Sequence, residues 1–387
     1  MSDLFTVDEL ADAARRETRL EDLGDPSWRE GLERLLESAA READLNPIGR
    51  EVLRGWVHRR LVSRLRVIDW TQRHPELRRE RIQRPLFVIG MLRTGTTLLC
   101  ELLARDPANR PLWKWEALDC VPPPERAHFA DDPRIAKMVA EMEQTYARVP
   151  ALKAIHFEPG DGPTECVALL GQTFRSQDWV GLFRVPGYSA WLHGACEMRP
   201  AYAHHRVALQ LLQSRAPGRW SLKAPGHLFA LDALRAEYPD ARFIVTHRDP
   251  QKTVPSSASL SVTARPESLT RSRNDPRAYF GALWLEILGG MTDRLIEFRA
   301  RRGDAGFADL AYRDFVRDPI AAVRGAYARF GEALTPEAEA AMRAHLAASP
   351  QGRWGKHAYA AEDFGLRREV IDERFRAYRE RFGVEAE

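Results

Sequence analysis

The chain has 387 residues, of which 44% are hydrophobic and 29% charged, a composition typical of an ordinary globular protein. A formal net charge of +3 is too small to favour a nucleic-acid partner. The longest apolar run, residues 278–291, is too short to span a bilayer, so we expect no integral membrane segment. The N-terminus MSDLFTVDEL has no apolar core typical of a signal peptide, and the four cysteines form no CxxC pair or zinc-binding spacing. We therefore expect a cytoplasmic protein with free thiols and no metal site.

The first 83 residues have the pattern of helices. Thr6-Val7-Asp8-Glu9 fits a capping box, and Pro26-Ser27 begins a second amphipathic run. A third run, from Ile48 to Arg73, ends before His74-Pro75, because the residue before a proline disfavours the helical conformation. We expect residues 1–83 to be a helical N-terminal extension that packs on the main domain.

From residue 84 onward, short apolar runs alternate with helical patterns. The predicted strands are Leu86–Ile89, Leu112–Trp115, Trp220–Leu222, Phe243–Thr246 and Phe307–Leu310, and the predicted helices are Thr97–Arg105, His227–Tyr238, Pro250–Val262 and Pro319–Phe330. Such alternation is typical of a parallel sheet covered by helices on both faces. We expect an α/β domain over 84–387, with three layers and a central parallel sheet of about five strands. A helical insertion over 131–215 is predicted to shape a substrate pocket.

In open parallel sheets the ligand lies beyond the carboxyl ends of the strands, so residues just after each strand are the candidates. The first strand runs into the loop VIGMLRTGTTLL, where Gly90 and Gly95 have the spacing of a Walker A loop and Thr97 stands at its Ser/Thr position. Thr96 stands where an NTPase has lysine, and a cation appears instead at Arg93. The loop therefore predicts an anion site different from that of an ATPase.

Three further segments place polar residues after strands. Arg248 follows the fourth predicted strand and Ser256 lies on the next helix, so the two can converge on one anion. Lys223 ends the third strand, with His227 four residues later, and Tyr312 follows the fifth. Considered alone, a tyrosine at the end of a strand often only fills the core.

Together these four segments resemble the sulfotransferases that use 3′-phosphoadenosine-5′-phosphosulfate (PAPS). The resemblance covers residues 84–365, and the elements Trp115–Leu118 and Leu222–His227 resemble the bacterial branch that carries an N-terminal helical extension. It implies a P-loop-NTPase-like three-layer fold and PAPS as co-substrate. The residues that match the donor-binding positions of the family are Arg93, Thr94, Gly95, Thr96 and Thr97 for the 5′-phosphosulfate, Arg248 and Ser256 for the 3′-phosphate, and Tyr312 beside the adenine. Lys356 is a further candidate for the 3′-phosphate, although the Gly355-Lys356 order is reversed relative to the cytosolic branch.

The resemblance also implies a mechanism of in-line transfer to a hydroxyl group. Arg93 would stabilise the leaving 5′-phosphate oxygens, Lys223 would hold the sulfuryl oxygens, and either Glu116 or His227 would be the general base. His156 and Glu165 are weaker candidates for contact with the acceptor. A phosphate monoester leaves, so we expect no Mg²⁺ requirement.

The acceptor is expected to be a hydroxyl-bearing small molecule, lipid or glycan. Aromatic residues in the insertion, among them Trp179, Phe183, Tyr188 and Trp191, favour a lipid or aromatic alcohol. Two alternatives stay open at this point: a P-loop kinase or NTPase that uses ATP, and a nucleotide-binding protein without catalysis. The oligomeric state is not predicted.

Overall fold

A computed structural model describes residues 4–265, 269–271, 275–348 and 359–387. Its N-terminal region is helical, with α1 (Val7–Thr18), α2 (Trp28–Glu42), α3 (Pro47–Arg73) and the 3₁₀ helix η1 (Pro75–Arg79). The backbone N–H of Thr6 donates to Glu9 Oε2 at 2.8 Å, and the N–H of Glu9 donates to Thr6 Oγ1 at 3.1 Å. These two bonds confirm the predicted capping box at the start of α1.

The centre of the molecule is a five-stranded, all-parallel sheet. Its strands are β1 (Leu86–Gly90), β2 (Asn109–Pro111), β3 (Arg219–Lys223), β4 (Arg242–His247) and β5 (Phe307–Ala311), in the order β2-β3-β1-β4-β5. Further helices are α4 (Thr96–Leu103), α5 (Lys114–Leu118), α6 (Pro133–Arg148), α7 (Pro150–Ile155), α8 (Val167–Leu170), α9 (Asp178–Leu182), α10 (Pro186–His193), α11 (Arg199–Gln213), η4 (Pro225–Ala230), α12 (Leu231–Glu237), α13 (Pro250–Ala264), α14 (Arg277–Arg302), α15 (Tyr312–Arg317), α16 (Pro319–Arg329), α17 (Pro336–Ala348), α18 (Arg368–Arg374) and α19 (Arg376–Phe382).

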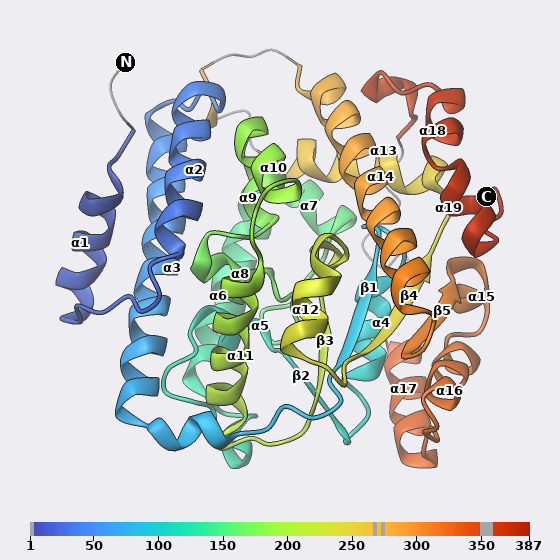
Figure 1. Ribbon diagram of the computed structural model, residues 1–387, viewed down its shortest axis with the longest axis horizontal. Coiled ribbons are helices and arrows are strands. Elements are labelled where there is room, and N and C mark those ends of the chain that lie inside the picture. Colours follow the sequence, from blue (N-terminus) through green and yellow to red (C-terminus); the bar gives the residue numbers. More distant parts are fainter. Residues whose placement is uncertain (1–3, 266–268, 272–274, 349–358) are drawn as a thin grey trace.

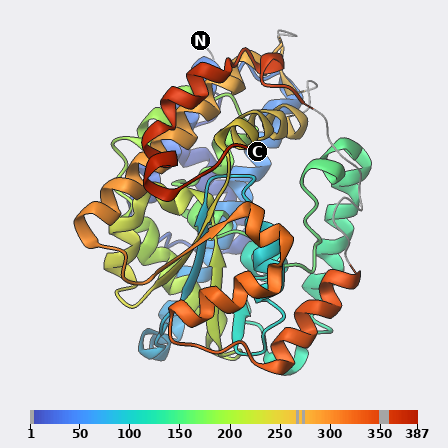
Figure 2. The ribbon, with the colours of Figure 1, turned by 90° about the vertical axis from the view of Figure 1, so that its right-hand side faces the viewer.

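The central strands β1 and β4 are buried on both faces, which is why they are runs of mostly apolar residues rather than alternating patterns. On β1, Phe87 and Ile89 belong to the larger core, which includes side chains of α11, α12 and α14. Leu86 and Val88 belong to a second core on the opposite face, with side chains of α4, α16 and α17. The sheet therefore lies between two layers of helices, and the predicted α/β three-layer fold is confirmed (Figure 1; Figure 2).

The N-terminal helices share the larger core with the sheet. Leu32 of α2 and Leu61 of α3 are fully buried members of the same apolar cluster as Phe87. A helical N-terminal region is thus present, while the boundary proposed at residue 83 stays a prediction. Helices α6 to α11 follow one another between β2 and β3, over the range expected for the insertion.

One strand was predicted wrongly. The second strand is Asn109–Pro111, three residues earlier than expected, and residues 114–118 form the short helix α5. The carboxylate of Glu116 accepts a hydrogen bond from the backbone N–H of Trp113 at 3.0 Å, which favours a helix start at this point. The apolar residues after Pro111 therefore pack as a loop and a helix instead of a strand.

The order of the strands determines where a ligand can bind. After β1 the chain moves outward past β3 to β2, and after β3 it crosses to β4 on the other side of β1. A crevice forms where the direction of the connections changes, beyond the carboxyl ends of the strands. The segments after β1, β3 and β4 all lie at this edge, so the topology brings together the residues predicted from the sequence.

Candidate active site

The loop between β1 and α4 is tightly folded. Gly90 has φ 149° and its Cα lies so near Thr246 that an added Cβ would come within 2.4 Å of the threonine Oγ1. Gly95 has φ 89° and precedes α4, and a Cβ there would lie 3.2 Å from the Tyr312 ring. Only glycine fits both positions without strain. The glycine spacing seen in the sequence is therefore required by the backbone.

Thr94 stabilises the loop from inside. Its Oγ1 donates to the Met91 carbonyl oxygen at 2.7 Å and lies 2.6 Å from Thr246 Oγ1, and its side chain is fully buried. The first N–H groups of a helix have no acceptor within the helix, so the start of α4 at Thr96 and Thr97 is suited to an anion. The Thr94 hydroxyl is thus structural, while the helix start is suited to bind a ligand.

Arg93 connects the loop to α13. It adopts a positive φ of 67°, and its Nε donates to Ser256 Oγ at 3.2 Å. Arg248 Nη1 donates to the Arg93 carbonyl oxygen at 2.9 Å. Burial lowers the pKa of Arg93 below its usual value, and Arg248 lowers it further. A partly buried cation beside a second cation is costly, so an anion here would be stabilised by both guanidinium groups.

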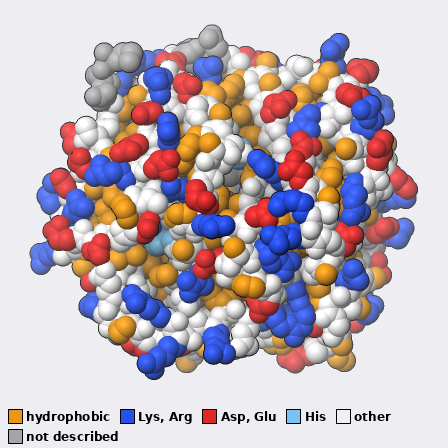
Figure 3. All heavy atoms as spheres, viewed as in Figure 1, with side chains coloured by type: hydrophobic (Ala, Val, Ile, Leu, Met, Phe, Trp, Pro, Cys, Tyr) orange, Lys and Arg blue, Asp and Glu red, His pale blue; other side chains and the backbone are white. Residues whose placement is uncertain are grey.

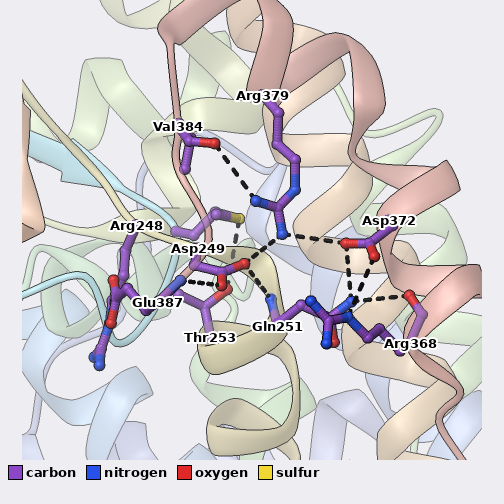
Figure 4. Close-up of polar contacts among 10 residues, drawn as sticks. Arg248, Asp249, Gln251, Thr253, Arg368, Asp372, Arg379, Val384 and Glu387 are labelled. Carbon is purple, nitrogen blue, oxygen red and sulfur yellow. Dashed lines mark hydrogen bonds and ion pairs between the residues drawn. The ribbon is translucent and has the colours of Figure 1, made fainter.

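Tyr312 borders the same cluster. The Arg248 guanidinium carbon lies 3.8 Å from the centre of the Tyr312 ring, an arrangement typical of a cation–π contact. On its other side, Arg248 Nε donates to both carboxylate oxygens of Glu387, at 3.2 and 3.1 Å (Figure 4). The residues that the sequence placed after β1, β4 and β5 are therefore brought into one cluster.

Lys223 belongs to a second charged cluster, at the end of β3. Its Nζ lies 2.7 Å from Glu165 Oε1 and 4.0 Å from Glu158 Oε1. Glu158 also forms an ion pair with Lys114, and its Oε1 lies 3.3 Å from His156 Nε2. Burial disfavours the charged ammonium of Lys223, but Glu165 and Glu158 outweigh it and raise the pKa above its usual value. Lys223 is therefore a fixed cation.

Glu158 is held ionised in the same cluster. Burial alone would raise the pKa of its carboxyl group, but Lys114, His156 and Lys223 outweigh that effect and hold the pKa well below its usual value. Glu165 is more accessible, with 21% of its side chain exposed. Two carboxylates and an imidazole thus lie in one charged cluster with Lys223 and Lys114.

Glu116 is enclosed in an ion pair. Its side chain has no exposed surface, and its two oxygens lie 2.7 Å from Nη1 and Nη2 of Arg110. The Arg110 guanidinium in turn lies 4.1 Å from the centre of the Trp220 ring. A carboxylate fixed in this way has a structural explanation, and nothing in its surroundings suits proton transfer to a substrate. The base role predicted for Glu116 stays a prediction without geometric support.

His227 lies in the larger core. Its Nδ1 is 2.7 Å from the Tyr202 hydroxyl, and its ring packs edge-on against Phe87, 5.2 Å between centroids. It has no exposed surface, and burial lowers the pKa well below the usual 6.5, with His205 adding to the effect. Its ring neighbours are Phe87, Tyr202 and His205, and the lowered pKa favours the neutral imidazole. The alternative base role of His227 also stays untested.

Three of the four aromatic residues named in the insertion are buried in the core, and the fourth, Trp191, is partly buried against it. Trp179, Phe183 and Tyr188 are at most 2% exposed, so they carry no preference for an apolar acceptor. Two cavities of about 250 and 340 Å³ lie elsewhere, and neither is lined by Arg93, Lys223 or Arg248. The predicted Lys356 lies outside the described residues.

Three residues at the site escaped the sequence reasoning. Lys114, Glu158 and Glu387 lie far along the chain from their partners, so no local motif points to them. One signal was available for Lys114, because it is one of only six lysines among 58 basic residues. Among the described residues, no group of three or more potential ligands is arranged for a metal ion.

Within the same described part of the chain, no helix is both long and apolar enough to cross a bilayer. On the face drawn in Figure 3, positively and negatively charged side chains are intermixed over most of the surface. A surface of mixed sign is typical of globular proteins in general.

Comparisons with known proteins identify the family to which the fold is similar. Residues 85–336 match a model described as the sulfotransferase family. The crystal structure of sulfotransferase STF9 from Mycobacterium avium is 34% identical, with a TM-score of 0.92 over 99% of this chain and 98% of that one. Sulfotransferase STF1 from Mycobacterium tuberculosis H37Rv is 35% identical, with a TM-score of 0.86 over 97% of this chain and all of that one. An omega-hydroxy-beta-dihydromenaquinone-9 sulfotransferase, Stf3 of Mycobacterium tuberculosis, is 25% identical over 313 residues, which are 78% of this chain and 75% of the relative.

Proposed function

The chain belongs to the sulfotransferase family, and on that premise we propose that it transfers the sulfuryl group of PAPS to a hydroxyl group of an acceptor. The observation that carries the proposal is the cluster of Arg93, Arg248, Ser256 and Tyr312 around the loop after β1. Two cations, a hydroxyl and an aromatic ring beside a helix start suit a nucleotide with phosphate groups at both ends. The loop lacks the lysine of an ATPase, which disfavours the kinase alternative.

Each residue has a role in this proposal. The bond from sulfur to the 5′-phosphate breaks as a bond from sulfur to the acceptor oxygen forms, and negative charge builds on the departing phosphate. Arg93 and the N–H groups at the start of α4 stabilise that charge, and Lys223 holds the equatorial sulfuryl oxygens. Arg248 and Ser256 bind the 3′-phosphate, while Tyr312 lies beside the adenine. Lys356 keeps its proposed contact with the 3′-phosphate.

We assign the general base to Glu165 rather than to Glu116 or His227. Glu165 is accessible and lies 2.7 Å from Lys223, so an acceptor hydroxyl beside the sulfuryl group would lie within its reach. Glu165 would take the hydroxyl proton as the new bond forms. The change Glu165→Gln is expected to lower kcat at least 100-fold while the affinity for adenosine 3′,5′-bisphosphate (PAP) is unchanged. Retention of wild-type kcat would return the base role to the other two candidates.

The acceptor class is part of the same proposal. One relative is named for a hydroxylated dihydromenaquinone, a lipid alcohol, and we propose a lipid or small-molecule alcohol here in preference to a glycan. We also retain the cytoplasmic location, which the four free cysteines support. Metal independence follows from the phosphate monoester leaving group, and activity in the presence of a chelator would test it.

The decisive experiment follows two labels. The protein is incubated with ³⁵S-labelled PAPS or γ-³²P-labelled ATP, together with lipid and small-molecule alcohols. We expect label to move only from PAPS, to be lost in Arg93→Ala, and to persist in Arg317→Ala, where an exposed arginine of α15 is changed. Transfer from ATP alone would refute the proposal. Binding of PAP without transfer to any acceptor would favour the non-catalytic alternative.

A further inference from the structure

The segment that follows α19, residues 384–387, is fixed to the start of α13. The backbone N–H of Glu387 donates to Asp249 Oδ2 at 2.8 Å. Arg379 forms an ion pair with Asp249 Oδ1, and its Nη1 donates to the Val384 carbonyl oxygen at 3.4 Å. Asp249 therefore connects the segment to the helix that carries Ser256 (Figure 4).

This arrangement places a carboxylate on the arginine assigned to the 3′-phosphate. Both Glu387 oxygens accept from Arg248 Nε, and the two side chains are 23% and 19% exposed, so water screens the pair only in part. Arg248 also donates to the Arg93 carbonyl oxygen and stacks on Tyr312. The guanidinium is thus held from three sides, and its third partner is an anion.

We propose that Glu387 is an internal competitor for the anion that binds at Arg248. The inference rests on the proposed function, because it takes the 3′-phosphate as the ligand of Arg248. A phosphate monoester carries more charge than a carboxylate and offers three acceptor oxygens, so it is the stronger partner for a guanidinium. The two anions repel each other at one cation, and Glu387 moves away when the nucleotide binds.

The contacts that hold the segment are weak enough for this exchange. Glu385 pairs with Arg313 at 2.6 Å, but both side chains are about two-thirds exposed, and such pairs contribute little. Glu385 and Ala386 are exposed, the Glu387 side chain is partly exposed, and of this segment only Val384 packs against the core. The segment is therefore held mainly by polar contacts to Asp249, Arg379 and Arg248. The nucleotide replaces the contact to Arg248.

Calorimetric titration of the full chain tests the proposal with two nucleotides and two matched variants. PAP has the 3′-phosphate and adenosine 5′-monophosphate lacks it. In Glu387→Gln we expect PAP to bind about three- to fivefold more tightly, while the affinity for the monophosphate is unchanged. The control Glu385→Gln alters the same segment without touching Arg248, and both affinities should equal those of the wild type. Thermal unfolding of each variant checks that the fold is intact.

Each other result has a definite meaning. Unchanged PAP affinity in Glu387→Gln refutes the competition, and weaker PAP binding would show instead that Glu387 positions Arg248 for the ligand. A gain for both nucleotides, or the same gain in Glu385→Gln, would also refute it, because the effect would not be specific to the 3′-phosphate. If PAP and the monophosphate bind the wild type equally, the assignment of Arg248 fails first, and the proposed function is weakened independently of Glu387. In an Arg248→Gln background, the Glu387 effect should disappear.

Discussion

The ion pair between Glu116 and Arg110 gives the sharpest test of structure against sequence. The family resemblance made Glu116 a candidate base, whereas the structure encloses it with Arg110, which is 3% exposed. The change Glu116→Gln removes one charge and leaves the other buried. Breaking a buried pair in this way costs about 3–5 kcal/mol.

The surroundings of Arg110 determine where in this range the cost falls. Its guanidinium also donates to the carbonyl oxygens of Ala216, Pro111 and Leu212, at 2.8, 3.1 and 3.1 Å. Glutamine can still accept a hydrogen bond from Arg110, so we expect the lower end, about 3 kcal/mol. That loss would be a large part of the 5–15 kcal/mol typical of a folded protein.

Urea unfolding and steady-state kinetics together separate the two readings of Glu116. For Glu116→Gln we expect the urea concentration at the unfolding midpoint to fall, while the dependence of the unfolding free energy on urea stays unchanged. The kcat per folded molecule should stay near the wild-type value. The double change of Arg110 and Glu116 to leucine should not recover this stability, because it leaves three backbone carbonyl oxygens without the donor that Arg110 supplies. An unshifted midpoint with a kcat at least 100-fold lower would refute the structural reading and support Glu116 as the base.

Three further predictions concern the loop, the lysine and the buried histidines. Lys223→Met should lower kcat about 10²–10³-fold without changing PAP affinity, because PAP has no sulfuryl group; parallel loss of both in calorimetry and kinetics would contradict the assignment. Gly95→Ala should lower the unfolding free energy by about 1–2 kcal/mol and weaken PAP binding, because φ of Gly95 is 89° and the Tyr312 ring is close. The control Gly325→Ala, in open space on α16, should not lower the unfolding free energy in the same urea titration. Burial lowers the pKa of His193 to about 4 and of His205 to about 3, while the unfolded imidazoles titrate near 6.5. Below pH 6.5 the unfolded chain therefore binds more protons than the folded chain. As the pH is lowered from 6.5 to 4, the free energy of unfolding should fall by about 1.4 kcal/mol per histidine for each pH unit, and His205→Gln should reduce this slope.

The sequence predicted well those features that depend on neighbouring residues. Apolar runs located four of the five strands, because strands buried on both faces need continuous apolar residues. The glycines of the loop and Arg248 after β4 were also predicted correctly as positions, because each is recognised from its place directly after a predicted strand. β2 was placed three residues late because its residues, Asn109, Arg110 and Pro111, form no apolar run.

The rest depended on contacts between distant parts of the chain. Arg248 and Glu387 are 139 residues apart, and Lys223 and Glu165 are 58 apart, so neither partner could be inferred from a motif. For the other candidate site residues, the outcome depended on whether the fold buries the side chain. Glu116, His227 and three aromatic residues of the insertion are chemically suited to a site, but the fold places them inside the protein: Trp179, Phe183 and Tyr188.

Tyr312 has a consequence for attempts to change the specificity of this protein. Its ring lies beside Gly95 and against the Arg248 guanidinium. In the proposed function these neighbours serve opposite ends of the donor, so one side chain couples the two half-sites. Replacing Tyr312 to accept another base would alter the shape of the loop and the orientation of the cation together. Engineering of donor preference therefore has to redesign Tyr312, Gly95 and Arg248 as a unit.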